Sequence, residues 1–147
     1  MKPDRLVSAD DPDWLALRLA LWPDCSPQQH LEEIAGFLRE PFRFVQFIAR
    51  DANGRGVGIA EASIRTDYVN GTSSSAVAYL EGIYVRPDAR GQGVATGLVQ
   101  AVSEWALSRG CRELASDTQP ENLVSQAFHS QLGFVETERA VFFSKPL

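Results

Sequence analysis

Cysteine, long apolar runs and repeats are scarce or missing in this 147-residue chain, and each absence narrows the possible functions. Its two cysteines, Cys25 and Cys111, lack the spacing of metal ligands, so we expect reduced thiols and no metal site. No run of residues is long and apolar enough to span a membrane, and the first residues have no signal-peptide core. We therefore expect a cytoplasmic protein without a membrane partner.

Excess positive charge is also missing. The formal net charge is −5 at pH 7, with neither an acidic tail nor a block of like charges. Such a field repels nucleic acid and attracts cationic partners, although a modest negative charge also serves solubility. Because the composition is ordinary, with 44% hydrophobic and 22% charged residues and no internal repeat, we expect residues 1–147 to form one domain.

The stretch 76–95 is the most informative part of the chain. Residues 76–85 are apolar and rich in β-branched and aromatic side chains, which predicts a buried strand. Pro87 ends this strand, and a turn with Gly91 and Gly93 leads into apolar residues at helical spacing. A strand, a glycine turn and a helix N-terminus together bind phosphate, because the first N–H groups of a helix are free and its dipole favours an anion.

Two nucleotide-binding motifs are excluded at this turn. No Gly-Lys-Ser/Thr ends it, and the next glycine, Gly97, comes one residue too late for the dinucleotide fingerprint. What remains is Arg90-x-x-Gly93-x-Ala95 after a strand, which resembles the acetyl-coenzyme A signature of the GCN5-related N-acetyltransferase (GNAT) superfamily. A tight turn with a helix cap is the alternative interpretation.

The order of the predicted elements resembles the same superfamily. Periodicity and turn residues predict helices at about 12–22, 26–39, 94–109 and 122–132, and a polar loop at 68–75. The predicted strands lie at 3–8, 42–50, 57–64, 76–85, 113–117, 134–138 and 139–145. This order predicts an α/β fold, with a mixed, mostly antiparallel central sheet and helices on both faces.

The second half of the chain carries further matches. Asn122 and the ending Leu132-Gly133-Phe134 fit the superfamily pattern, but His129 stands where relatives have a tyrosine that is the presumed general acid. A protonated His129 could donate to a thiolate, whereas a histidine on a helix face is more often structural.

A finer resemblance is to the aminoglycoside 6′-N-acetyltransferases, in which the change from tyrosine to His129 also occurs. It is carried by Leu21-Trp22-Pro23 and by the segments 62–71, 80–83, 110–113, 115–118 and 136–139. The resemblance implies acetyl-CoA as acetyl donor, a cationic aminoglycoside as acceptor and a homodimer. The apolar residues 141–143 could pack across a two-fold axis or form an internal strand.

Acetyl transfer needs an amine that has lost its proton, and primary amines are mostly protonated at neutral pH. Glu81 is a carboxylate within an apolar strand, so we favour it as the group that holds the ammonium and takes its proton; a salt-bridged edge position is the alternative. Asp117 ends the next strand and is the second acidic candidate. The Val85 N–H would polarise the acetyl carbonyl.

The resemblance assigns the other contacts. The predicted acetyl-CoA contacts are Ile83, Tyr84, Val85, Arg90, Gly91, Gln92, Gly93, Val94, Ala95, Asn122 and His129. The predicted acceptor contacts are Trp22, Asp67, Tyr68, Glu81, Asp117 and Glu136. Turn capping for Asp67, core packing for Trp22 and plain solvation for Glu136 are the alternatives.

Three functions follow from these patterns. The first is acetyl transfer from acetyl-CoA to the 6′-amine of aminoglycosides, by direct attack of the amine on the thioester, which confers antibiotic resistance. The second is N-acetylation of another small amine or of a protein N-terminus. The third is a non-catalytic CoA-binding module.

Overall fold

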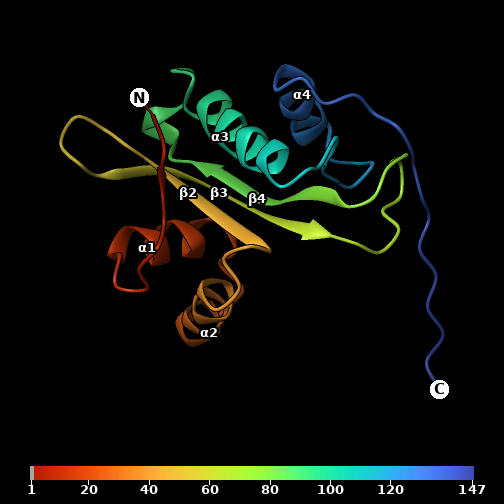
Figure 1. The fold of residues 1–147 in the computed structure, drawn as a ribbon, viewed down its shortest axis with the longest axis horizontal. Coiled ribbons are helices and arrows are strands. Elements are labelled where there is room, and N and C mark those ends of the chain that lie inside the picture. Colours follow the sequence, from red (N-terminus) through yellow and green to blue (C-terminus); the bar gives the residue numbers. More distant parts are fainter. Residues whose placement is uncertain (1) are drawn as a thin grey trace.

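A five-stranded sheet in the order β1-β2-β3-β4-β5 forms the centre of the computed structural model, which describes residues 2–147 (Figure 1). Neighbouring strands are antiparallel except for β4 and β5, which are parallel. The strands are β1 (Asp4–Arg5), β2 (Phe44–Arg50), β3 (Gly56–Arg65), β4 (Val77–Val85) and β5 (Leu114–Ala115). The prediction of a mixed, mostly antiparallel sheet is confirmed.

Helices cover both faces of this sheet, as predicted (Figure 1). One face carries α1 (Pro12–Leu21) and α2 (Pro27–Leu38), and the other carries α3 (Val94–Ser108) and α4 (Leu123–Gln131), with a short 3-10 turn, η1 (Pro87–Ala89), after β4. Side-chain caps explain where two of them begin: Asp11 accepts from the Asp13 N–H, and Ser26 forms a reciprocal capping box with Gln29.

The core consists of two apolar layers, one on each side of the sheet. Because successive side chains of a strand point to opposite faces, Ile59 packs beneath α1 and α2 while its neighbour Ala60 packs beneath α3. Trp14 and Leu98 are both fully buried, one in each layer. Within residues 2–147 we find no helix that is both long and apolar enough to cross a membrane.

The predicted strands at 134–138 and 139–145 are wrong. Residues 134–147, here called the tail, form neither strand nor helix and run away from the sheet (Figure 1). A strand needs a backbone partner, and β5, the edge strand next to β4, consists of only Leu114 and Ala115. An edge this short gives the tail few backbone groups with which to pair. Val141, Phe142 and Phe143 are consequently 78%, 85% and 92% exposed.

Two other strands are shorter than predicted. The strand expected at 3–8 is limited to Asp4–Arg5, and the one expected at 113–117 to Leu114–Ala115. Both sit at an edge of the sheet, where a strand has a neighbour on one side only. Short edge strands also protect a sheet from pairing with other chains.

Candidate active site

The turn between η1 and α3 is built to bind an anion. Gly91 and Gly93 have φ angles of 74° and 80°, which favour glycine, and both are exposed. Among the described residues, the N–H groups of 91–96 have no hydrogen-bond partner, and the first helical bond runs from Gly97 N to Gly93 O at 3.0 Å. These free donors at a helix N-terminus fit a pyrophosphate, the group predicted for this turn.

Arg90 contributes to this turn differently than its place in the motif suggests. Its Nε donates to the Val85 carbonyl oxygen at 2.9 Å, and its guanidinium lies 5.8 Å from the centre of the Tyr84 ring. The side chain therefore folds back along β4 and fastens the turn to the strand. The groups of this turn that remain available to the predicted pyrophosphate are its backbone N–H groups and the exposed Gln92 side chain, rather than the Arg90 guanidinium.

The outer edge of β4 is paired over only part of its length. β5 pairs with Ala78 and Tyr79, and beyond Tyr79 no strand in residues 2–147 pairs with β4 on this edge, whereas β3 continues along the other. The backbone N–H of Arg86 donates to Val57 O on β3 at 2.8 Å. Because successive N–H groups of a strand point to opposite sides, the N–H of Tyr84 also faces β3, and those of Ile83 and Val85 point to the unpaired edge. An extended ligand can add there like a strand, as predicted for the pantetheine arm.

A β-bulge places Glu81 at the start of this unpaired edge. Glu61 of β3 pairs with Gly82, but Ala62 pairs with Leu80, so Glu81 is the extra residue on β4. A bulge increases the local twist and re-aims the side chain. The Glu81 side chain remains 36% exposed within a strand whose first half is buried.

Glu81 is held by two neighbours on β3. The Ser63 hydroxyl donates to Oε1 at 2.6 Å, and the Arg65 guanidinium donates to both carboxylate oxygens at 2.9 Å. The salt bridge considered for Glu81 from the sequence is therefore present. The pair lies where β5 ends and the outer edge of β4 becomes unpaired, and the Arg65 side chain is 43% exposed.

Arg65 and Tyr79 connect the two predicted acidic residues. The Arg65 guanidinium lies 3.6 Å from the centre of the Tyr79 ring, and the Tyr79 hydroxyl donates to Asp117. Burial, and then the hydrogen bond to Asp117, raise the pKa of Tyr79, so the phenol keeps its proton and remains a donor. The structure thus brings Glu81 and Asp117 into one network.

Sequence reasoning did not select Arg65 or Tyr79 as site residues. Residues two apart on a strand share a face, so the spacings of Ser63 to Arg65 and of Tyr79 to Glu81 were a usable signal. The signal becomes a contact only once the register is known, because Ser63 lies opposite Tyr79.

Trp22 forms a wall next to the bulge. A Cβ added at Gly82 would lie 2.5 Å from the Trp22 ring, so the indole packs directly on the β4 backbone. Behind it, the Arg18 guanidinium lies 4.8 Å from the ring centre, and buried His30 hydrogen-bonds the Trp22 carbonyl through Nε2 at 3.1 Å. Trp22 is therefore packed in place beside Gly82, and its contact with the acceptor stays a prediction.

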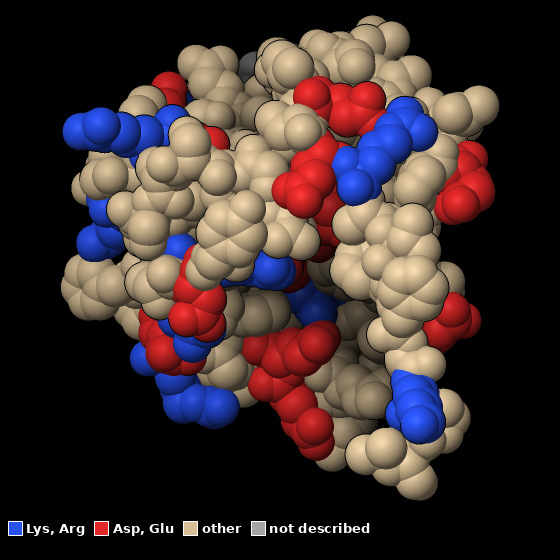
Figure 2. All heavy atoms as spheres, turned by 90° about the vertical axis from the view of Figure 1, so that its right-hand side faces the viewer, with Lys and Arg blue, Asp and Glu red and all other residues tan. Residues whose placement is uncertain are grey.

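The remaining predicted acceptor residues lie on the loop after β3 and on the tail. Asp67 and Tyr68 are exposed, Tyr68 by 79%, and Glu136 is paired with Arg139. The tail passes this loop, since a Cβ at Gly71 would meet Thr137 at 2.2 Å (Figure 1). The face at this end is hollowed, and acidic side chains border the hollow (Figure 2).

His129 and Asn122 make local structural bonds. His129 Nδ1 lies 2.8 Å from Ser125 O, a group that only accepts, so Nδ1 donates to it, and Nε2 lies 2.7 Å from the Ser116 hydroxyl. Asn122 caps α4 by accepting from Ser125 N at 3.0 Å. Because Nδ1 is bonded within α4 and Nε2 ties α4 to Ser116 after β5, the geometry favours the structural interpretation of His129.

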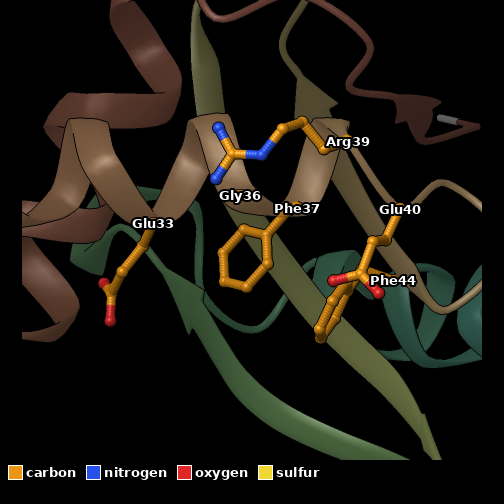
Figure 3. Close-up of a pocket in the computed structure, with 6 residues that line it drawn as sticks. All are labelled: Glu33, Gly36, Phe37, Arg39, Glu40 and Phe44. Atoms are coloured by element: carbon orange, nitrogen blue, oxygen red, sulfur yellow. The ribbon is translucent and has the colours of Figure 1, made fainter.

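A separate cavity of about 350 Å³ opens at the end of α2 (Figure 3). It is lined by Glu33, Gly36, Phe37, Arg39, Glu40 and Phe44. None of these is a predicted site residue, and Glu33 is already paired with Arg18. Within residues 2–147, no three His, Cys, Asp or Glu side chains are grouped to hold a metal ion.

Comparison with known proteins decides the family. The model of the acetyltransferase (GNAT) family matches residues 6–134. The chain belongs to this family. Within the GNAT family, it is 53% identical to the aminoglycoside N(6′)-acetyltransferase type 1 of Serratia marcescens, over 91% of each chain. It is 50% identical to the protein of the same name from Acinetobacter genomosp. 13, over 90% of each chain.

Solved structures of GNAT enzymes agree with this assignment. AAC(6′)-Ih of Acinetobacter baumannii superposes with a TM-score of 0.93 at 44% identity, covering 99% of this chain and 98% of its own. AAC(6′)-Iy, in complex with the bisubstrate analogue CoA-S-monomethyl-acetylneamine, superposes with a TM-score of 0.92 at the same identity and coverage. AAC(6′)-Iy has also been solved with CoA.

Proposed function

We propose that this protein is an aminoglycoside 6′-N-acetyltransferase, which transfers the acetyl group of acetyl-CoA to the 6′-amine of aminoglycoside antibiotics and so confers resistance. The similarity to N(6′)-acetyltransferases over nine-tenths of the chain, at 53% identity, carries this proposal. The anion-binding turn and the acidic network at Glu81 are the parts that such a reaction needs.

The donor binds along β4 and its following turn. The free N–H groups of 91–96 hold the pyrophosphate of CoA, and the pantetheine arm runs along the unpaired edge, pairing with the backbone of Ile83 and Val85. This places the thioester near the Val85 N–H, which donates to the carbonyl oxygen as negative charge develops on it. Arg90 holds the Val85 carbonyl and so keeps this N–H in position.

The acceptor binds as a cation on the other side of the bulge. Glu81 and Asp117 attract its ammonium groups, and the face of Trp22 offers a cation–π contact beside them. Asp67, Tyr68 and Glu136 extend this surface along the loop and the tail. Glu81 takes one proton from the 6′-ammonium, which frees the lone pair for attack.

The transfer itself is a direct displacement. The amine nitrogen forms a bond to the acetyl carbon, and the carbon–sulfur bond breaks with its electron pair leaving on the CoA sulfur. The nitrogen gives up its remaining excess proton, and the thiolate is released as the thiol after taking a proton. The products are the 6′-acetamide and CoA.

Turnover of tobramycin and kanamycin with acetyl-CoA, followed by release of free CoA thiol, tests this function. Glu81→Gln keeps the shape of the side chain but removes the proton acceptor, so kcat/KM should fall about 10²–10⁴-fold. CoA affinity, measured by calorimetry, should not change.

Two results would contradict the proposal. If only other amines or peptide N-termini were acetylated, the protein would be a different N-acetyltransferase. If the wild-type protein bound CoA but acetylated neither the aminoglycosides nor the other amines and peptides tested, it would be a CoA-binding module.

We further propose that the protein is a homodimer of single-domain subunits and that it works in the cytoplasm. The exposed apolar residues of the tail, Val141, Phe142 and Phe143, support association, because they have no cover within one chain. The two free thiols of Cys25 and Cys111 suit a reducing compartment.

A further inference from the structure

Arg65 occupies the position of a cation in the network that joins Glu81 to Asp117. Its guanidinium contacts both oxygens of Glu81 at 2.9 Å and covers the face of Tyr79 at 3.6 Å. Tyr79 in turn donates to Asp117. One positive charge thus lies against the carboxylate and the aromatic face that would bind an ammonium, and the same tyrosine reaches the second acidic group.

The bidentate pair leaves Glu81 with little capacity for a second cation. Oε1 already accepts from Ser63 and from two nitrogens of Arg65, and Oε2 accepts from Arg65. An incoming ammonium needs one of these oxygens and also the space above Tyr79. It therefore competes directly with Arg65.

The pair is also placed so that it can open. The side chains of Arg65 and Glu81 are 43% and 36% exposed, and solvent-exposed ion pairs contribute little to stability. Arg65 is the last residue of β3, next to the exposed loop that carries Asp67. A polycation can therefore displace the guanidinium at small cost.

We propose that Arg65 is an internal competitor of the acceptor: it orients Glu81 in the free enzyme and is displaced from Glu81 by the ammonium of the substrate. This inference rests on the proposed function and adds a positioning residue that sets acceptor affinity. Acceptors with several charges are favoured over monoamines, because they can pay the cost of displacement with contacts elsewhere on the acidic face.

Calorimetric titration of tobramycin into the CoA-bound protein tests the inference. Arg65→Gln removes the competing charge, so tobramycin should bind about fivefold more tightly than to wild type. Arg65→Lys restores a cation at the same place, and its dissociation constant should return to within about twofold of wild type.

Arg43→Gln is the matched control. Arg43 also has a carboxylate partner, Glu40, at 3.7 Å and lies 5.0 Å from the centre of an aromatic ring, that of Phe44, but its side chain pairs with neither Glu81 nor Tyr79. The Arg43→Gln substitution removes one positive charge, as Arg65→Gln does, and should leave tobramycin affinity within about twofold of wild type. A loss of packing alone would weaken binding in Arg65→Gln, so tighter binding distinguishes competition from structural support.

Equal or weaker tobramycin binding by Arg65→Gln overturns the inference, as does an equal gain in Arg43→Gln. A crystal structure of the wild-type complex with CoA and tobramycin gives a test without any variant: an amine on Glu81 with Arg65 moved away supports displacement, and an unbroken Arg65–Glu81 pair refutes it. Turnover of tobramycin by wild type reports separately on the proposed function.

Discussion

At the scale of single residues, the site depends on where one extra residue falls in β4. Glu81 and Gly82 are adjacent, yet the Glu81 side chain is partly exposed and paired with Arg65, whereas Gly82 lies beneath the Trp22 ring. The bulge separates their roles. Gly82 has no side chain because the indole fills the space, and Glu81 is exposed because no residue of β3 lies opposite it.

Gly82→Ala should therefore harm the acceptor site. The new Cβ would lie 2.5 Å from the Trp22 ring, and overpacking of this kind costs about 1–3 kcal/mol. We expect a lower free energy of unfolding in urea and a higher KM for tobramycin, with little change in the KM for acetyl-CoA.

Gly36→Ala is the control for this substitution. At Gly36, in α2, the nearest atom to an added Cβ is 3.7 Å away, and a helical Gly→Ala change stabilises by about 0.5–1 kcal/mol. If Gly82→Ala were as stable and as active as Gly36→Ala, Trp22 would not be a fixed wall of the site.

At the scale of elements, the candidate site forms where β4 is no longer paired with β5 and where the turn to α3 follows it. The strand presents backbone groups on its unpaired edge, and the turn presents the free N–H groups of the α3 N-terminus a few residues later. Both depend on backbone geometry more than on side-chain identity. The glycines of the turn matter because their φ angles are positive.

Gly93→Ala should weaken donor binding selectively. The φ of Gly93 is 80° and no atom lies within 4 Å of an added Cβ, so the effect comes from backbone strain of about 1–2 kcal/mol. Relaxation of the turn would misalign its N–H groups, and the KM for acetyl-CoA should rise about 5–20-fold.

Gly54→Ala provides the same strain at another place. Its φ is 81°, it too has open space around it, and it lies in the β2–β3 hairpin. The KM for acetyl-CoA should not change in this variant. An equal rise in both variants would mean that the effect reports general loss of stability.

At the scale of the whole molecule, the tail is the feature that one chain does not explain. Helices on both faces of the sheet cover two apolar layers, but Phe142 and Phe143 are 85% and 92% exposed and lie next to each other in the tail. Extended apolar segments of this kind pair with or pack on another copy.

Phe142→Glu should therefore shift the protein toward monomer. Light scattering after size exclusion should give a dimer for wild type and a smaller mass for the variant at the same concentration, because a charge cannot be buried in the proposed interface without cost. Lys145→Gln changes the net charge by the same −1 in the same tail and should remain dimeric. A monomeric wild type would contradict the homodimer.

Most of the fold could be predicted from local signals. Caps, periodicity and glycine turns are short-range effects, and they predicted helices α1 to α4, the antiparallel strands at the sheet's centre and the glycine turn before α3. The strands at 134–138 and 139–145 could not be assessed in this way. Alternating apolar residues indicate that a segment can form a strand, but a strand forms only where a partner is available.

The candidate groups can be recognised from local patterns along the chain: a glycine turn for an anion, a carboxylate within an apolar strand, and an aromatic residue at the end of the first helix. How these groups combine follows only from the folded structure. The bulge, the Arg65–Glu81 pair and the bond between His129 and Ser116 join separate segments of the chain, so they depend on strand register and packing. Register is a property of paired strands, and no single strand's sequence contains it.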